Sequence, residues 1–151
     1  MRALLRDIPA TELAGLRRPT EDDVDALGGL MYRAYAGTID YDGETAEEAL
    51  AEVRRTFVGE YGAFDPAHST VAKRSGRLVS ATLVTHWQER PFVAFTMTDP
   101  AFARQGLARA TLERSMHLLR QSGETELRLV VTIDNEPARL LYESLGFVRE
   151  P

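Results

Sequence analysis

The spacing of apolar residues predicts two helices in the first sixty positions of the chain. The first follows Thr20, a residue type that caps helix N-termini, and the second follows Thr45, which forms with Glu48 the pattern of a capping box. Gly28 and Gly29 weaken the first helix by about 1 kcal/mol each relative to alanine, so we expect a bend or close packing there. The apolar positions of the two helices are Val24, Leu27, Met31, Ala34 and Tyr35, then Leu50, Val53 and Phe57.

In the middle of the chain the apolar pattern changes to the two-residue period of strands. Residues 70–73 and 78–86 read as two strands joined by the turn Ser75-Gly76-Arg77, which predicts a hairpin. The run 92–98 predicts a third strand. Its residues Val93, Phe95 and Met97 are predicted to share one face.

The last third of the chain alternates between helical and strand patterns. A helix is predicted over 107–121, a strand over 127–133 and a second helix over 135–145, which Gly146 ends. Residues 147–149 could begin a last strand. The order of these elements predicts an α/β (α+β) fold with a mixed central sheet.

Composition and charge narrow the class of protein. A chain of 151 residues, 44% hydrophobic and 27% charged, fits one folded domain over residues 1–151. A net charge of −5 argues against general nucleic-acid binding, because duplex affinity depends on Lys and Arg. The absence of cysteine excludes disulfides, thiolate metal ligands and a cysteine nucleophile, and we expect no metal site.

The N-terminal segment carries no targeting signal that we can identify. Residues 1–10 contain Leu4 and Leu5 but no long apolar run, so we expect neither a signal peptide nor a membrane span. We interpret residues 1–10 as a loosely held lead-in, followed by a short strand over 13–17. The cytoplasm is the expected location.

The segment 99–109 suggests a site for phosphate oxygens. It joins a predicted strand to a predicted helix through a short basic turn, and the first amides of a helix have no partners within it. Gly106 lets the backbone approach an anion, Ala108 keeps the next turn slim, and Arg104 and Arg109 add positive charge. In an acidic protein, such a local basic turn predicts a small anionic ligand.

A second segment, 134–148, adds to this site. Asn135 is placed as the cap of the last helix, and Pro137 is tolerated in its first turn. Tyr142 lies two turns into that helix, so its hydroxyl is predicted to point toward the interior edge of the sheet. Two successive strand–helix units bring both helix starts near the carboxyl ends of neighbouring strands, where open α/β sheets hold ligands.

Together these two segments resemble the GNAT superfamily of N-acyltransferases. The family pattern Gln/Arg-x-x-Gly-x-Gly/Ala corresponds to residues 103–108, with Ala103 in place of Gln or Arg. The entry to the first helix, Arg17-Pro19-Thr20 and Asp23, is also similar to that of the family. The family block Asn-x-x-Ala…Leu-Tyr-x-x-Leu-Gly-Phe appears as Asn135, Ala138, Leu141, Tyr142, Leu145, Gly146 and Phe147.

The resemblance implies an acetyl-CoA-dependent N-acetyltransferase that transfers the acetyl group directly to a primary amine of a small molecule or peptide. Backbone groups of Thr96, Met97 and Thr98 would bind the pantetheine arm. Asn135 would contact pantetheine or only cap its helix, and Tyr142 would protonate the leaving thiolate or only fill the core. The pyrophosphate would be held by Arg104, Gln105, Gly106, Leu107, Ala108 and Arg109.

The acceptor amine would lie near the loop between the first two helices. Asp40, Tyr41 and Asp42 belong to that loop, where carboxylates suit a cationic amine, although a charge run is also common in a solvated loop. Where the chain stops, many members of the family continue through another strand. The sheet would then be short at that end or be completed by a second subunit, as in a homodimer.

Departures from the family pattern leave alternatives open. Strand 92–98 has no Glu or His, and Val130 stands where other members place a Glu, so the sequence names no general base. A catalytically silent acyl-CoA-binding sensor or interaction module of the same fold is one alternative. Binding of another nucleotide is disfavoured, because neither a Gly-x-x-x-x-Gly-Lys-Ser/Thr nor a Gly-x-Gly-x-x-Gly pattern is present. His68, His86 and His117 are expected to be structural or exposed.

Overall fold

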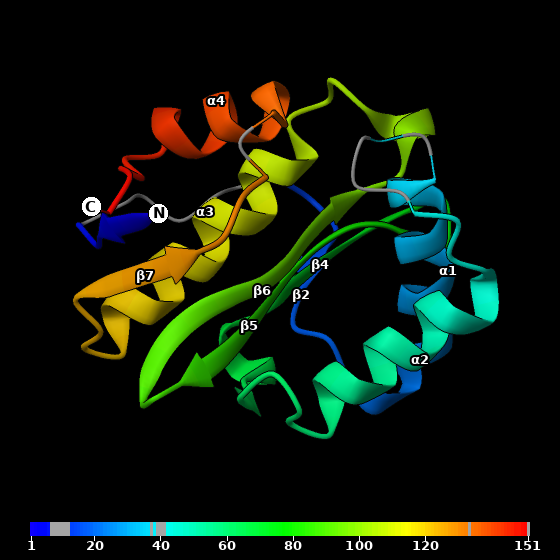
Figure 1. The fold of residues 1–151 in the computed structure, drawn as a ribbon, viewed down its shortest axis with the longest axis horizontal. Coiled ribbons are helices and arrows are strands. Elements are labelled where there is room, and N and C mark those ends of the chain that lie inside the picture. The colour runs from blue at the N-terminus through cyan, green and yellow to red at the C-terminus, as the bar shows by residue number, and fades with distance from the viewer. Residues whose placement is uncertain (7–12, 37, 39–41, 133, 151) are drawn as a thin grey trace.

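The computed structural model describes residues 1–6, 13–36, 38, 42–132 and 134–150. In this part of the chain the sheet has the strand order β1-β7-β6-β5-β4-β2, and β3 pairs with β5 outside that path (Figure 1). The strands are β1 Arg2–Leu4, β2 Leu16–Arg17, β3 Ala63–Phe64, β4 Thr70–Arg74, β5 Arg77–Trp87, β6 Arg90–Thr98 and β7 Glu126–Leu129. The helices are α1 Val24–Tyr35, α2 Ala46–Phe57, α3 Leu107–Gln121 and α4 Glu136–Ser144, with 3₁₀ turns at Glu21–Asp23, Pro66–His68 and Pro100–Phe102.

Helices cover both faces of the sheet, and each face has its own apolar cluster. One cluster joins α1 and α2 to β4, β5 and β6, and the other joins α3 and α4 to β1, β7 and parts of β5 and β6 (Figure 1). Strands β6 and β7 run parallel whereas the other pairings are antiparallel. The predicted α/β fold with a mixed central sheet is therefore confirmed. None of the described helices is long and apolar enough to cross a membrane.

The predicted start of α2 is confirmed by its capping box. The Thr45 hydroxyl accepts the amide of Glu48 at 3.1 Å, and the Glu48 carboxylate accepts the amide of Thr45 at 3.3 Å. The close packing expected at the glycine pair is found at Gly28, where an added Cβ would lie 2.9 Å from the Cα of Leu50. Gly28 therefore allows α1 and α2 to approach each other closely.

Residues 1–6 are not part of the loosely held lead-in that we expected over 1–10, and residues 7–10 lie outside the described residues. Residues Arg2–Leu4 form β1, an edge strand antiparallel to β7, and the side chains of Ala3 and Leu5 are buried in the apolar cluster under α3 and α4. The expected strand over 147–149 is reduced to one bridge, in which Arg2 and Val148 exchange backbone hydrogen bonds of 2.9 Å. The sheet edge beside β7 is thus occupied by this same chain.

Strand β6 changes face in its middle, contrary to the expectation that Val93, Phe95 and Met97 share one face. Leu83 pairs with Phe95 but Val84 pairs with Val93, so Ala94 is an extra residue that forms a bulge. Val93 consequently packs in the cluster under α3 and α4, whereas Phe95 and Met97 pack in the cluster under α1 and α2.

Strand β7 is shorter than predicted and ends at Leu129. It pairs with β6 only at Phe92–Arg128 and Val93–Leu129, after which the two strands separate. After Leu129 the described residues no longer form strand hydrogen bonds with β6. The alternation of apolar and polar residues continues through Val131, but these residues do not extend the sheet. The last predicted strand residue, Ile133, lies outside the described residues. The opening between β6 and the segment after β7 contains the candidate site.

Candidate functional site

Three adjoining cavities follow the opening between β6 and the segment after β7. The loop groove, of about 520 Å³, lies between the end of β6, the start of α3 and α4. The middle pocket, of about 160 Å³, lies between β6 and the segment after β7. The acidic pocket, of about 540 Å³, lies between α1, α2 and β6. Thr96, Asn135, Ala138 and Tyr142 line both the groove and the middle pocket, and Tyr35, Ala94 and Phe95 line both the middle and the acidic pockets.

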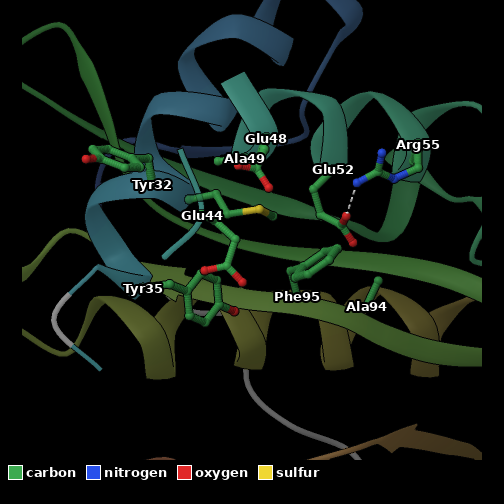
Figure 2. A pocket seen from close by; sticks show the side chains of 10 residues that line it. Tyr32, Tyr35, Glu44, Glu48, Ala49, Glu52, Arg55, Ala94 and Phe95 are labelled. Atoms are coloured by element: carbon green, nitrogen blue, oxygen red, sulfur yellow. Dashed lines mark hydrogen bonds and ion pairs between the residues drawn. The ribbon is translucent and has the colours of Figure 1, made fainter. Parts of the chain in front are cut away.

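The acidic pocket takes its charge from one side of α2 and the residues before it. Glu44, Glu48 and Glu52 recur every four residues and all line the cavity (Figure 2). The Arg55 guanidinium donates to the Glu52 carboxylate at 2.5 Å and so compensates its charge. Glu44 and Glu48 accept hydrogen bonds from backbone amides, and no cationic side chain among the described residues forms an ion pair with either.

The residues predicted for acceptor binding are only partly described. Asp40 and Tyr41 lie outside the described residues. Asp42 is exposed and donates its amide to Glu44, but it does not line the acidic pocket. The sequence pattern indicated Glu48 only as a helix cap, because capping and charge cannot be separated in the sequence alone.

Tyr35 lies where the acidic pocket meets the middle pocket, and its hydroxyl donates to the Thr96 carbonyl oxygen at 3.3 Å. The sequence pattern marked Tyr35 only as an apolar helix position. Its hydroxyl was a signal for a second role, because a tyrosine that is largely covered usually finds a hydrogen-bond partner for that group.

The loop before α3 presents backbone donors to the loop groove. Gly106 is the N-cap of α3, with a left-handed φ of 74°, and no side chain caps the helix at this residue. A Cβ added at Gly106 would meet nothing within 4 Å, so the space beside it is open. Because the first amides of an α-helix lack intrahelical partners, this helix start is suited to an anion.

The two predicted basic residues of this loop have different surroundings. Arg104 is exposed and makes no hydrogen bond or ion pair with any described residue. The Arg109 guanidinium donates to the Ser144 hydroxyl on α4 and to Glu113 at 3.4 Å. Arg109 therefore ties α3 to α4, and Arg104 is the more available cation.

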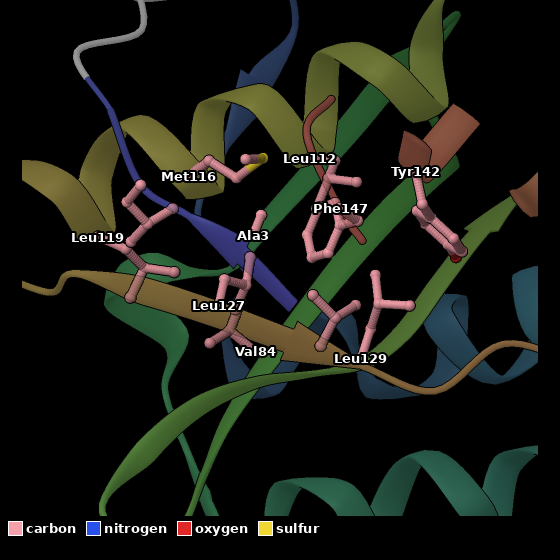
Figure 3. Packing of buried hydrophobic residues seen from close by; sticks show 11 residues of the cluster. Ala3, Val84, Leu112, Met116, Leu119, Leu127, Leu129, Tyr142 and Phe147 are labelled. Atoms are coloured by element: carbon pink, nitrogen blue, oxygen red, sulfur yellow. The ribbon is translucent and has the colours of Figure 1, made fainter. Parts of the chain in front are cut away.

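Tyr142 comes from α4 and is 8% exposed (Figure 3). Its ring packs edge-on against Phe147, with 5.9 Å between the ring centroids, which holds the side chain between α4 and the sheet. The Asn135 side chain accepts the amide of Ala138 at 3.3 Å and so caps α4, as predicted. All the residues predicted to bind the cofactor except Gln105 line the loop groove, together with Tyr142.

The histidines contribute to none of these cavities. His68 and His86 both contact the same oxygen of Asp65, at 2.7 and 2.6 Å, beside the end of β5 away from the loop groove. This cluster joins β5 to the Pro66–His68 turn, which fits the structural role expected for both residues. Val130 is 80% exposed and lines the middle pocket, where it supplies no titratable group.

Comparison with known proteins identifies relatives of this chain. The chain is 31% identical over 163 aligned positions to a mycothiol acetyltransferase of Thermobispora bispora, an alignment that covers 98% of this chain and 52% of that protein. The chain thus spans about half the length of this relative.

Solved structures show the same fold. The crystal structure of the ribosomal-protein-S18-alanine N-acetyltransferase from Escherichia coli matches with a TM-score of 0.70 at 24% identity, over 90% of this chain and 78% of that one. PaiA N-acetyltransferase from Thermoplasma acidophilum, solved in complex with coenzyme A, matches with a TM-score of 0.68 at 17% identity, over 89% of each chain.

The family model for the acetyltransferase (GNAT) family matches residues 32–147, which include both segments that line the loop groove. The match and the shared fold agree with the resemblance seen in the sequence. This chain belongs to the acetyltransferase (GNAT) family.

Proposed function

We propose that this protein is an acetyl-CoA-dependent N-acetyltransferase that acts on a cationic primary amine in a ternary complex. The continuity of the three cavities supports this proposal most directly. The loop groove shares residues with the middle pocket, which in turn shares residues with the acidic pocket. Two substrates that enter from opposite ends would meet in the middle pocket, between Tyr35 and Tyr142.

The loop groove fits the coenzyme. The uncapped amides at the start of α3 and the Arg104 guanidinium suit a diphosphate. Beyond Val93, strand β6 has no β7 partner, so its edge can pair with the amide groups of a pantetheine arm through Thr96, Met97 and Thr98. In support, the Thermoplasma acidophilum relative of the same fold was solved with coenzyme A.

The acidic pocket fits the acceptor. Glu44 and Glu48 carry negative charge that Arg55 does not compensate, and carboxylates attract a protonated amine. Met31 and Phe95 supply apolar walls for the carbon chain of that amine. Asp40, Tyr41 and Asp42 remain proposed acceptor contacts from the sequence, because they lie two to four residues before Glu44, although Asp42 itself does not line the pocket.

The chemistry follows from this arrangement. The bound ammonium group first releases one proton to water, and the resulting neutral amine attacks the acetyl carbonyl. The carbon–sulfur bond then breaks, the nitrogen loses a second proton as the amide forms, and the thiolate gains one proton. Tyr142 lines both the loop groove and the middle pocket, and it is proposed to supply that proton. General-acid catalysis of this kind contributes about 10²–10⁴-fold to the rate.

Release of free thiol from acetyl-CoA, measured across a panel of mono-, di- and polyamines, aminoglycosides and peptides, tests the proposal. We expect turnover with at least one cationic amine and none with neutral alcohols. Binding of coenzyme A without turnover on any amine would instead support the silent acyl-CoA sensor. The absence of a carboxylate on strand β6 and of Gln or Arg at position 103 favours that second candidate.

A further inference from the structure

Asp99 is a buried carboxylate at the junction between β6 and the loop that leads to α3. It is 3% exposed, and three donors surround its two oxygens. The amide of Ala101 donates to Oδ1 at 2.9 Å. Arg33 and Arg77 both donate to Oδ2, at 2.8 and 2.9 Å.

These contacts bring three distant elements to one point. Arg33 belongs to α1, which lines the acidic pocket, and Arg77 begins β5. The Asp99 backbone is fixed as well, because its amide donates to Val79 and its carbonyl accepts the amide of Phe102. The loop 100–106 therefore begins from a position that α1, β5 and β6 determine together.

The charge of this cluster also has a consequence for an anionic ligand. A lone carboxylate beside a phosphate site would repel the ligand. One arginine would neutralise Asp99, and the structure supplies two, so the cluster carries a net positive charge. Burial alone would raise the pKa of Asp99, but the Ala101 amide and the two arginines outweigh it and hold that pKa below its usual range. The carboxyl group stays ionised at neutral pH.

We propose that Asp99 is a positioning residue for the diphosphate of the coenzyme. Arg33 and Arg77 hold its carboxylate in place, and the carboxylate in turn fixes where the loop 100–106 begins. This inference rests on the proposed function. The loop has one further described anchor, the Phe102 side chain, which packs against the small apolar cluster that contains Leu107. Asp99 fixes where the loop starts, and Phe102 fixes its middle.

The test compares ligands with and without the diphosphate. Coenzyme A carries it, whereas pantetheine keeps the arm and lacks both the diphosphate and the phosphorylated adenosine attached to it. Asp99→Asn keeps the size of the side chain and an oxygen for the Ala101 amide, but removes the charge that holds both guanidinium groups. We expect its Kd for coenzyme A, measured by calorimetry, to rise about tenfold, the value of one charge-assisted hydrogen bond. We expect its Kd for pantetheine to stay unchanged.

Asp23 provides a matched control. It is also buried, accepts the amide of Thr20 at 2.8 Å and forms a two-pronged ion pair with Arg17 at 2.7 and 2.8 Å. Neither Asp23 nor Asp99 lines any of the three cavities, but Asp99 directly follows Thr98, which lines the loop groove, whereas no neighbour of Asp23 in the chain does. Asp23→Asn should therefore reduce stability without changing the ratio of the two dissociation constants. A purely structural role of Asp99 would make Asp99→Asn behave in the same way.

Arg77→Gln keeps the inference testable if Asp99→Asn does not fold, because Arg77 is half-exposed and Asp99 retains Arg33. We expect it to weaken coenzyme A binding by about threefold, less than a full charge-assisted hydrogen bond, and to spare pantetheine. If the unmodified protein binds no coenzyme A, the proposed function itself fails. If it binds coenzyme A, but in the folded variants the two dissociation constants are unchanged or rise by the same factor, only the positioning role of Asp99 is overturned.

Discussion

Buried hydroxyl groups line the interface between the sheet and α3, and most of them form pairs. Thr82 shares a hydrogen bond with Thr111 at 3.0 Å, and Thr70 shares one with Ser115 at 2.9 Å. Two other buried hydroxyls of the sheet, those of Thr85 on β5 and Thr96 on β6, have no partner among the described residues. Burying a polar group without a partner costs free energy, so these two positions are not optimised for stability.

Thr85→Val should make the protein more stable. Valine has nearly the same shape as threonine and removes the unpartnered hydroxyl, so we expect the free energy of unfolding to rise by about 1 kcal/mol. Thr82→Val is the matched control, because it removes the buried hydrogen bond to Thr111, whose hydroxyl then keeps only the Ala108 carbonyl, and it should lower that free energy. Denaturant unfolding of both variants checks the prediction, and equal effects of the two substitutions would contradict it.

Tyr142→Phe should separate chemistry from binding. The ring still packs against Phe147, so the fold and the affinity for coenzyme A should be retained. Loss of the hydroxyl should lower kcat by about 10²-fold or more, if it is the proton donor. Single-turnover kinetics and calorimetry on the same preparation measure the two quantities. Unchanged kcat would remove Tyr142 from the mechanism.

The sequence was sufficient to identify the predicted residues of the loop groove, because two short motifs, one in 96–109 and one in 135–142, contain them. Arg104, Gly106 and Asn135 could be located in this way, and they line one groove. The acidic pocket could not be predicted, because its walls come from α1, α2 and β6, which only tertiary packing brings together. Within that pocket, the charge of Glu52 is paired with Arg55 whereas that of Glu48 is not, and this pairing too depends on side-chain packing.

At the scale of elements, helix starts and the hairpin followed from local signals such as the Thr45–Glu48 capping box. Features that depend on a partner strand could not be predicted from such local signals. The bulge at Ala94 arises from the register of β6 against β5, and an alternating pattern contains no information on that register. The early end of β7 likewise reflects the departure of β6 after Val93.

The contact between α1 and α2 gives a test of packing against helix propensity. Gly28→Ala places a methyl group 2.9 Å from the Leu50 Cα, which is backbone and cannot move alone. We expect the free energy of unfolding to fall by about 1–3 kcal/mol. Gly29→Ala meets only the flexible end of Arg33 at 3.2 Å, so we expect a gain of up to about 1 kcal/mol from helix propensity. Thermal unfolding of both variants distinguishes them, and equal destabilisation would contradict this interpretation.

The charged side of α2 gives a test of acceptor recognition. Glu48→Gln removes a charge from the acidic pocket but keeps the capping box, which glutamine also forms. We expect KM for a cationic amine to rise about fivefold, with kcat little changed, because an attraction of roughly 1 kcal/mol is lost. Glu47→Gln, one residue away but outside the pocket, is the control. Steady-state kinetics with the best amine of the panel measures both, and equal KM values for the two variants would argue against this pocket.

For the whole molecule, two buried carboxylates couple stability to pH. The hydrogen bond from Arg17 lowers the pKa of Asp23, and the donors around Asp99 lower its pKa against the effect of burial. A carboxyl group whose pKa is lowered by folding stabilises the protein above its unfolded pKa, and this contribution is lost as the pH falls through the folded value. Both groups therefore stabilise the protein at neutral pH.

We expect the free energy of unfolding to decrease below about pH 4, where unfolded aspartate begins to bind protons. Asp23→Asn should be less stable than the unmodified protein at pH 7, and the difference should narrow as the pH approaches 3. Urea unfolding at several pH values measures this. A difference that stays constant over the whole range would show that ionisation of Asp23 does not contribute.

The pairing of β1 with β7 has a consequence for the order of folding. The first strand of the chain has its partner near the other end, since Arg2 lies opposite Arg128. Contacts between residues so far apart in sequence carry a large loop-closure entropy and form late. During synthesis on the ribosome, β1 has no strand partner among the described residues until β7 has emerged. The N-terminal strand should therefore dock last and complete a sheet whose other strands are already in place.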